Sequence, residues 1–302
     1  MPILNIIPKD TNFKFMNLRK IAVIFSIFLF IISIIFLILR GLNFGIDFTG
    51  GVLIELRSQN ETINLVSLRK DLNKLNLGEI QLQTIGSDKD IAIRVQKSGG
   101  KDKQLDSINQ IKNSLSNLDI EFRRTEYVGP KVGKELIKAG ITALLFSLLG
   151  ILVYIWFRFE LNFALGAILA LLHDVFLTIG FFSIFQFEFN LATVAAVLTI
   201  AGYSINDTVV IYDRIRETMR KYKQISLEEI INLSLNGTLS RTVITSLTTL
   251  LALLALLIFG GSVISGFIIA LIWGVVIGTY SSLYIASPVL MMINTDTNKN
   301  KT

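Results

Sequence analysis

The chain has 302 residues, of which 52% are apolar and 17% are charged, and its mean hydropathy is +0.60. A soluble protein carries about 25% charged residues, so the composition excludes a soluble globular protein and predicts an integral membrane protein. The absence of cysteine excludes disulfides and thiolate metal sites, and the single histidine, His173, excludes sites that need two imidazoles. The net charge of +6 follows the predicted membrane topology, so we expect no nucleic-acid partner.

Residues 1–20 carry four Lys or Arg side chains and lead into an apolar segment, Ile21–Leu39, that contains no charge. This segment is too long for the apolar region of a typical cleavable signal peptide, and no small-residue cleavage site follows it. We therefore expect residues 1–20 to be a cytoplasmic N-terminus and residues 21–40 to be an uncleaved first transmembrane helix.

A glycine-rich stretch, Gly41–Gly51, follows the first span and includes Asp47 and Gly50. Glycine permits tight backbone bends, so physical grounds favour a turn that joins a helix to a strand. The alternative is a hinge or coupling element between the membrane part and the domain that follows.

Residues 41–138 have nearly balanced charge and a length that suits one small domain. Their alternating and helical apolar spacings predict the order β-α-β-β-α-β of a ferredoxin-like α+β fold. The expected elements are strands at Val52–Ser58, Glu79–Ile85, Asp90–Gln96 and Ile120–Val128, helices at Leu65–Leu75 and Leu105–Leu118, and a turn at Gly86–Lys89.

Residues 139–292 contain five further apolar segments, each long enough to cross a bilayer, and residues 293–302 form a polar tail. Gly274 and Gly278 are four residues apart and predict a helix face that packs closely. The expected spans are Ala139–Phe157, Leu161–Phe185, Phe189–Tyr212 and two within Thr242–Asn294 that Gly260–Ser262 divides.

The distribution of Lys and Arg predicts the orientation. These residues concentrate in the N-terminus, the loop between the fourth and fifth spans, and the tail, whereas Phe185–Phe189 and Gly260–Val263 carry none. The positive-inside rule therefore places both termini in the cytoplasm and the domain of residues 41–138 on the outer side. The basic run Arg214–Lys223 sets this topology, with contact to anionic membrane lipids as the lesser alternative.

Asp207 places a carboxylate inside the fourth predicted span, where an ionised group costs roughly 2.5–3.5 kcal/mol on insertion scales. Burial disfavours its charged form and a nearby guanidinium favours it, so a carboxylate balanced between the two can bind and release protons. Arg241, near the start of the fifth span, is expected at a comparable depth and could pair with Asp207. The alternative is a static Asp207–Arg241 pair that joins two helices.

Other polar residues surround this position. Tyr203 shares a helix face with Asp207, while Asn206 and Asp213 lie on a neighbouring face. Asp213 is favoured as an interfacial cap, although a place on a proton path is included in the prediction for both Asn206 and Asp213.

His173 and Asp174 lie near the middle of the third predicted span. Two interpretations have equal support: a second polar step in a water path, and a helix–helix hydrogen bond. We find no enzyme signature, because no Gly-x-Ser-x-Gly motif occurs and the one histidine is intramembrane.

Together these segments resemble the SecF family of bacterial protein translocase subunits, which belongs with SecD to an RND-like group, from about Asn17 to Met292. Four motifs carry the resemblance, and they occur in the family's order. They are Gly45-Ile-Asp-Phe-Thr-Gly-Gly51, Val128-Gly-Pro-Lys-Val-Gly133, Gly202-Tyr-Ser-Ile-Asn-Asp-Thr-Val-Val-Ile-Tyr-Asp-Arg-Ile-Arg216 and Leu239-Ser-Arg-Thr-Val-Ile-Thr-Ser-Leu-Thr-Thr249.

The resemblance implies a polytopic helical protein of the bacterial inner membrane, with six transmembrane helices in an RND-like half and one periplasmic α+β domain. It implies a heterodimer with SecD that assists export of unfolded preproteins after the SecYEG channel, SecA and accessory subunits have begun it. No cofactor is implied, since the proton gradient is the energy source. In the family the residues that match Asp207 and Arg241 are regarded as essential for proton conduction, and Asp47, Gly50, Gly51 and Gly202 belong to its motifs.

The hypothesis that follows is a cycle in which protonation of Asp207 loosens its pairing with Arg241 and shifts helices at the contact with SecD. That shift would move the outer domains, which hold the emerging polypeptide. Two alternatives remain. An RND-like small-molecule exporter half is disfavoured by the small outer domain, and a non-transporting scaffold would tolerate loss of the charge at Asp207 but not changes at Gly274 or Gly278.

Overall fold

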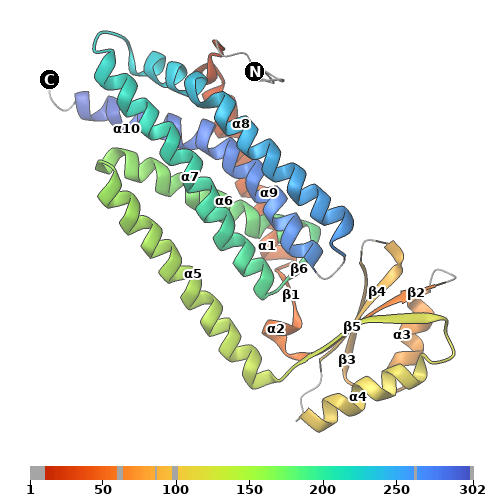
Figure 1. Cartoon of the computed structure of the whole chain (residues 1–302). Helices are drawn as coiled ribbons and strands as arrows, with labels where there is room; N and C mark the ends of the chain where they lie inside the picture. The colour runs from red at the N-terminus through yellow and green to blue at the C-terminus, as the bar shows by residue number, and fades with distance from the viewer. Residues whose placement is uncertain (1–10, 60–63, 86, 97–100, 262–263, 300–302) are drawn as a thin grey trace.

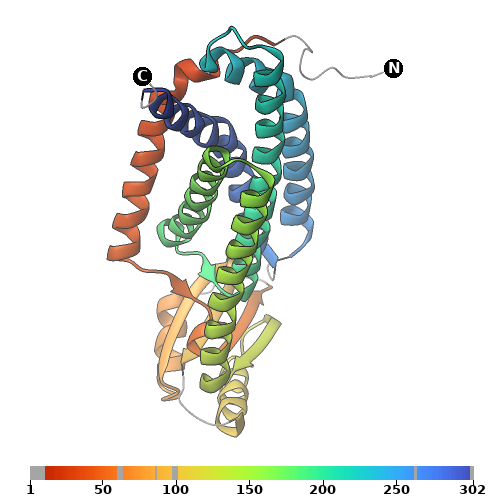
Figure 2. The same cartoon turned by 90° about the vertical axis from the view of Figure 1, so that its left-hand side faces the viewer.

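The computed structural model describes residues 11–59, 64–85, 87–96, 101–261 and 264–299. It has two parts, a bundle of long helices and a small α+β domain at one end of the bundle (Figure 1). The described ends of the chain both lie at the opposite end of the bundle, as Figures 1 and 2 show. The cytoplasmic location predicted for both termini stays a prediction.

Within the described ranges, six helical segments are long and apolar enough to cross a membrane, as predicted. A π-helical turn at Ser282–Ala286 interrupts the last segment, which continues from α9 into α10. The helices of these segments are α1 (Arg19–Leu39), α5 (Pro130–Arg158), α6 (Leu161–Phe185), α7 (Leu191–Lys221), α8 (Leu227–Phe259), α9 (Ser265–Ser281) and α10 (Ser287–Lys299).

Capping residues explain where two of these helices begin. Asn190 forms a capping box with Thr193 at the start of α7, and Ser226 accepts a hydrogen bond from the Glu229 backbone at the start of α8. Helix α7 extends beyond the predicted end at Tyr212, because an amphipathic stretch up to Lys221 continues the helix past the apolar part of the span.

Helix α6 lies at the centre of the bundle and has the largest buried share of the six segments, while α5 has the smallest and stands apart (Figure 1). The predicted close-packing face is confirmed within the chain. A Cβ added at Gly278 would lie 3.1 Å from Ser204 Cβ, and one added at Gly274 would overlap Ile200, so α9 touches α7 closely through its glycines.

The α+β domain has the predicted element order, and its four antiparallel strands lie in the order β3-β4-β2-β5. This is the strand order of the split β-α-β arrangement. Strand β4 begins three residues earlier than expected and α4 ends earlier, and Gly86 of the expected turn lies outside the described residues. The elements are β2 (Gly51–Ser58), α3 (Leu65–Asn73), β3 (Glu79–Ile85), β4 (Ser87–Gln96), α4 (Lys101–Ser114) and β5 (Ile120–Val128).

The two faces of this sheet have different environments. Alternate residues such as Val52, Ile54 and Leu56 pack under α3 and α4. The opposite face carries Leu53 and the charged side chains, and the short helix α2 (Ile46–Thr49) packs there through Ile46. A sheet buried on both faces explains why β2 is buried along almost its whole length.

Two adjacent glycines make the sharp turn from α2 into β2. Gly50 has φ 71° and ψ 167°, and Gly51 has φ 122°, both in regions that side chains rarely adopt. We expect Gly50→Ala to destabilise the protein by about 1–3 kcal/mol, measured as a lower urea midpoint of the full chain in detergent. Gly150→Ala is the matched control, because Gly150 lies in α5 with nothing near its added Cβ; equal midpoints for the two variants would contradict the strain.

Glu55 on β2 makes the stability of this domain depend on pH. Burial raises the pKa of the Glu55 carboxyl, opposed by Arg124, and the charge of Glu188 raises it further. Because the folded state then holds this proton more tightly than the unfolded state, the contribution is favourable below about pH 4.3 and is lost as pH rises through the folded pKa. We expect Glu55→Gln to reduce this loss of stability with rising pH. The measurement is the urea midpoint for unfolding of the α+β domain, followed by pulse proteolysis between pH 4 and 7.

Asp90 supplies the control of opposite sign. Its hydrogen bonds from Arg57 lower the pKa of the Asp90 carboxyl, so its contribution is present above about pH 3.9 and is lost as pH falls. Asp90→Asn should therefore weaken the domain at pH 7, whereas a Glu55→Gln variant that is weaker at pH 7 than the parent would contradict the assignment.

Candidate functional site

Asp207 lies on α7 at its contact with α8, inside a membrane-spanning segment. Its Oδ1 accepts a hydrogen bond from Thr242 Oγ1 at 2.8 Å. Its Oδ2 is buried and has no hydrogen-bond partner among the described residues. A buried carboxylate with one unused oxygen is costly when it is ionised, so this oxygen can take a proton or a donor from another chain.

The structure does not form the ion pair predicted between Asp207 and Arg241: no nitrogen of Arg241 lies within 4.0 Å of the Asp207 carboxylate. The expected depth is correct, because the next residue, Thr242, contacts Asp207. Successive helical residues are rotated by roughly 100°. Thr242 therefore takes the inward position, and Arg241 is exposed on the outer side of α8.

Tyr203 and Asp207 share one face of α7, as predicted, and both meet hydroxyl groups of α8. Tyr203 donates to Ser246 Oγ at 3.4 Å, and Ser246 is hydrogen-bonded to Thr279 Oγ1 of α9 at 2.7 Å. The structure does not bring Asn206 or Gly202 into this contact. Both are exposed on another side of α7, where nothing lies within 4 Å of a Cβ added at Gly202.

Asp174 is the centre of a second polar cluster, where α6, α7 and α9 meet. It is 0% exposed, and its Oδ2 accepts hydrogen bonds from Ser204 Oγ at 2.5 Å and Ser281 Oγ at 2.7 Å. Its Oδ1 lies 2.9 Å from Nδ1 of His173. Both oxygens of Asp174 are therefore engaged, in contrast to Asp207.

The cluster continues from His173 to the first helix. His173 Nε2 lies 3.2 Å from Ser26 Oγ of α1, and Ser26 Oγ lies 2.9 Å from the Tyr280 hydroxyl of α9. Tyr280 donates to the backbone oxygen of Ala22 at 2.7 Å. Of the two interpretations left open for His173 and Asp174, helix–helix hydrogen bonding is present in the structure, and a part in a proton path stays a prediction.

The π-helical turn after α9 places consecutive serines in the core. Ser281 binds Asp174, and Ser282 Oγ lies 2.8 Å from Thr208 Oγ1 of α7. Sequence reasoning missed these hydroxyl partners, because a serine or threonine in a membrane helix often bonds only its own backbone, as Thr248 does to the Ile244 oxygen. The missed partners of the acids and of His173 are Ser26, Ser204, Thr242, Tyr280 and Ser281.

Asp213 lies at the end of the membrane-spanning part of α7. Its Oδ2 accepts a hydrogen bond from Arg158 at the C-terminal end of α5 at 2.6 Å, and Arg216 lies 3.9 Å from Oδ1. About two fifths of each side chain of the Arg158 pair is exposed, which agrees with the interfacial interpretation of Asp213.

The segment after α1 connects the bundle to the α+β domain. Strand β1 (Asn43–Phe44) pairs in parallel with β6 (Glu188–Phe189), which joins α6 to α7. Asp47 Oδ2 accepts a hydrogen bond from the Leu191 backbone at the start of α7 at 3.0 Å. An acid at a helix N-terminus is stabilising, so the glycine-rich stretch contacts the start of α7 in addition to making the favoured turn. Its role as a coupling element stays a prediction.

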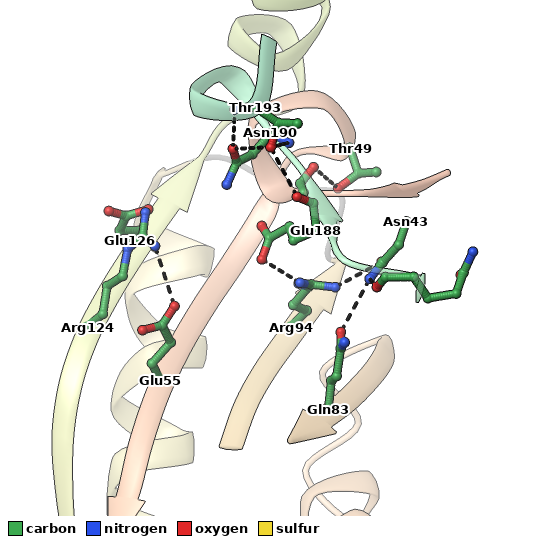
Figure 3. Close-up of polar contacts among 12 residues, drawn as sticks. Asn43, Thr49, Glu55, Gln83, Arg94, Arg124, Glu126, Glu188, Asn190 and Thr193 are labelled. Atoms are coloured by element: carbon green, nitrogen blue, oxygen red, sulfur yellow. Dashed lines mark hydrogen bonds and ion pairs between the residues drawn. The ribbon is translucent and has the colours of Figure 1, made fainter. Parts of the chain in front are cut away.

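We call the contact of β1, α2 and β6 with the sheet and the start of α7 the joint. Charged and amide side chains complete it, as Figure 3 shows. Arg94 of β4 donates to Glu188 of β6 at 2.5 Å and to Asn43 of β1 at 3.1 Å. Asn43 also donates to the Gln186 backbone oxygen and to Gln83 of β3. The Arg94 side chain is 8% exposed, so a buried cation of the domain is held by an acid of the loop between α6 and α7.

Close backbone contacts fix the joint on its other side. A Cβ added at Gly133 of α5 would lie 3.1 Å from the Phe48 backbone oxygen and 3.3 Å from that of Asp47. The motif that precedes the second span therefore packs directly on α2. Within the described ranges, no three His, Asp or Glu side chains are grouped so that they could hold a metal ion.

Comparison with known proteins identifies the family. The model of the SecD/SecF C-terminal family, described as protein export membrane protein SecD/SecF, matches residues 107–296, and the SecD/SecF GG motif matches residues 35–61. Protein translocase subunit SecF of Rickettsia rickettsii (strain Sheila Smith) is 49% identical over 300 residues, which cover 98% of this chain and 97% of that protein. The chain belongs to the SecF family. SecF of Rickettsia bellii (strain OSU 85-389) is also 49% identical, over 290 residues and 95% of each chain.

Solved structures of SecDF give the same fold. The crystal structure of SecDF from Thermus thermophilus matches 97% of this chain with a TM-score of 0.87 and 35% identity, and SecDF in a super-membrane-facing form matches the same share with 0.71 and 34%. This chain spans 40% of the length of each SecDF chain. The RND-like arrangement of six spans is thus that of a SecF-family protein translocase subunit.

The family's GG motif coincides with the joint. The matched residues 35–61 contain β1, α2 and β2, together with Asp47, Gly50 and Gly51. In this SecF-family chain the motif therefore makes the turn under the sheet, caps α7 and contacts α5.

Proposed function

We propose that this chain is the SecF half of a SecD–SecF complex in the bacterial inner membrane, where it uses the proton gradient to assist late steps of preprotein export. The observation that carries the proposal is Asp207, a carboxylate in a membrane span with one satisfied and one unpartnered oxygen. Intramembrane acids are functional by default because their cost must be offset. The partners that we propose for such a complex are preprotein, SecYEG, SecA and accessory subunits of the translocase.

An exposed polar face supports SecD as the direct partner. Asn206 and Gly202 of α7 and Arg241 of α8 are exposed although they lie in membrane-spanning segments. A guanidinium or an amide that faces lipid is costly, whereas small and polar residues favour helix–helix contact. The SecDF chain, described as a translocon-associated membrane protein, is longer than this one, which spans 40% of it. We infer that SecD covers such a face.

The mechanism proposed from this geometry differs from the pairing first expected. A proton taken up on Oδ2 of Asp207 neutralises the carboxylate, and the hydrogen bond from Thr242 holds the neutral and charged forms in one place. Arg241, directed outward next to Thr242, is the cation that a partner acid would meet. A proton entering from the outer side and leaving to the cytoplasm would alternate the contacts of α7 and α8 with SecD.

Motion at that contact would reach the α+β domain through the joint. Helix α7 begins at Leu191, which is bound to Asp47, and follows β6, which holds Arg94 through Glu188. A shift of α7 thus acts on the sheet without a flexible linker between them. We place the domain on the periplasmic side, where it would hold the emerging polypeptide.

A cross-linking experiment tests the partner. Since the chain has no cysteine, Asn206→Cys introduces a unique thiol on the exposed face of α7, and Phe146→Cys introduces one on the exposed side of α5. In membranes that contain SecD, the thiol at position 206 should cross-link to SecD and the thiol at position 146 should not. Equal labelling by lipid probes at both positions, without a SecD cross-link, would contradict the assignment.

A further inference from the structure

The hydrogen bonds around His173 determine how many protons the His173–Asp174 pair holds. A carbonyl oxygen only accepts hydrogen bonds, so Tyr280 donates its one hydroxyl proton to the Ala22 oxygen, at 2.7 Å. The contact between Tyr280 and Ser26 at 2.9 Å must then be donated by Ser26. Ser26 has used its own proton and accepts from His173, so Nε2 of His173 carries a hydrogen.

The other side of the ring needs a second proton. Ser204 and Ser281 donate to Oδ2 of Asp174, so the contact between Oδ1 and Nδ1 of His173 at 2.9 Å contains the remaining proton, on the nitrogen or on the oxygen. The pair therefore has no net charge, as imidazolium with carboxylate or as imidazole with carboxylic acid. This agrees with its burial, since a net charge in this position would be costly.

We propose that His173 and Asp174 form a second proton-binding site, separate from Asp207, which is occupied in this structure and releases its proton along Ser26 and Tyr280. This proposal rests on the proton-driven function proposed above and extends it to a second centre. The ligand of the site is the proton itself.

The release step balances atom by atom. The Nε2 proton of His173 passes to Ser26 Oγ, the former Ser26 proton passes to the Tyr280 oxygen, and the former Tyr280 proton leaves from the partly exposed Tyr280 side chain. Nδ1 keeps its hydrogen and donates to the Asp174 carboxylate. The hydrogen bonds between Tyr280, Ser26 and His173 Nε2 are then donated in the opposite direction, and the Ala22 oxygen has lost its donor.

The reversal would reach α1 because this helix is held through few side chains. Its buried residues within the span Arg19–Leu39 are Ala22, Ser26 and Ser33. Two of the three take part in the hydrogen-bond chain, so its proton content changes the contacts that hold α1 against α6 and α9. Helix α1 leads directly into β1 of the joint.

Among the described residues that face His173 and Asp174, Tyr280 is the other titratable group. Phe30 of α1 stacks on His173 and on Phe176 of α6, and the remaining polar neighbours are hydroxyl groups. The groups in contact with the pair are Ser26, Phe30, Ser204, Tyr280 and Ser281.

Nitrogen NMR of the full chain in lipid nanodiscs tests the proposal directly. Because His173 is the only histidine, ¹⁵N-histidine labelling gives one imidazole. We expect Nε2 to be protonated when the site is occupied and to become unprotonated as pH rises, while Nδ1 stays protonated. An Nε2 that carries no hydrogen at any pH, or one that never loses its hydrogen as pH rises, would overturn the proposal.

Tyr280→Phe separates the relay from a structural role. Without the hydroxyl, proton release no longer costs the bond to Ala22, so the midpoint of the Nε2 change should fall by up to about one pH unit, the equivalent of one hydrogen bond. Tyr284→Phe is the matched control, since the Tyr284 ring packs at a tilt against that of Tyr280, with ring centroids 5.7 Å apart, and its hydroxyl has no hydrogen bond to a described residue. An unchanged midpoint in Tyr280→Phe would contradict the relay.

The NMR signal distinguishes this proposal from the proposed function. It reports the proton at His173 whether or not the protein supports export. If Asp207→Asn leaves export unchanged while Nε2 titrates as expected, the proton-binding site stands and the role of Asp207 fails. If Nε2 does not titrate while Asp207→Asn stops export, the reverse holds.

Discussion

Replacing Asp207 with Asn is expected to slow preprotein export at least about tenfold, the factor that corresponds to about 1.4 kcal/mol. The amide keeps the size of the side chain and an oxygen that can accept from Thr242, which lies 2.8 Å away in the parent. It removes only the ability to bind and release a proton. The measurement is a pulse-chase assay of export in cells depleted of their own copy, with co-purification of SecD from the same cells.

Glu217→Gln is the control for this change. Glu217 lies further along α7, where its exposed side chain pairs with Arg214, and exposed pairs of this kind contribute about 0–1 kcal/mol. Export should be normal in this variant. Normal export in Asp207→Asn with an intact complex would instead favour the scaffold alternative, in which Asp207 only joins two helices.

Replacing Arg94 with Leu is expected to destabilise the attachment of the α+β domain by about 3–5 kcal/mol. Arg94 is 8% exposed and its partner Glu188 is 23% exposed, and removal of one partner of a buried ion pair leaves the other charge without compensation. The check is faster hydrogen exchange at β1 and β6 in the full chain, together with a lower urea midpoint.

Two further variants define the cause. Arg123→Leu removes an arginine of the same sheet that lies 3.8 Å from Asp90, and it should change stability by less than about 1 kcal/mol. Arg94→Leu combined with Glu188→Leu removes both charges, so it should recover much of the loss. If the double variant is as unstable as the sum of the single variants, the pair does not hold the joint.

The sequence alone predicted most of the fold, because its signals are long and repeated. Six apolar segments and a β-α-β-β-α-β pattern each extend over many residues, and both are present in the structure. Boundaries were less accurate where polar amphipathic stretches continue a helix, as at Lys221 of α7. The pairing of β1 with β6 could not be predicted, since each strand has two residues and they lie far apart in the chain.

The site was predicted less completely, for a physical reason. The ionisable residues Asp207 and Asp174 stood out because a charge in an apolar span is rare. Their partners did not, since hydroxyl side chains such as Thr242 and Ser26 are common in membrane helices. A direct Asp207–Arg241 ion pair is not formed in the structure, because sequence distance gives depth but not rotation. Thr242 faces inward to Asp207, and the neighbouring Arg241 is exposed.

The most direct test of the central claim is proton flux through the purified complex with SecD. Proteoliposomes with a pH-sensitive dye inside would carry an imposed proton gradient, and the parent complex would be compared with Asp207→Asn. We expect proton entry in the parent and a rate near that of empty vesicles in Asp207→Asn. An undiminished proton flux in the Asp207→Asn complex would contradict it.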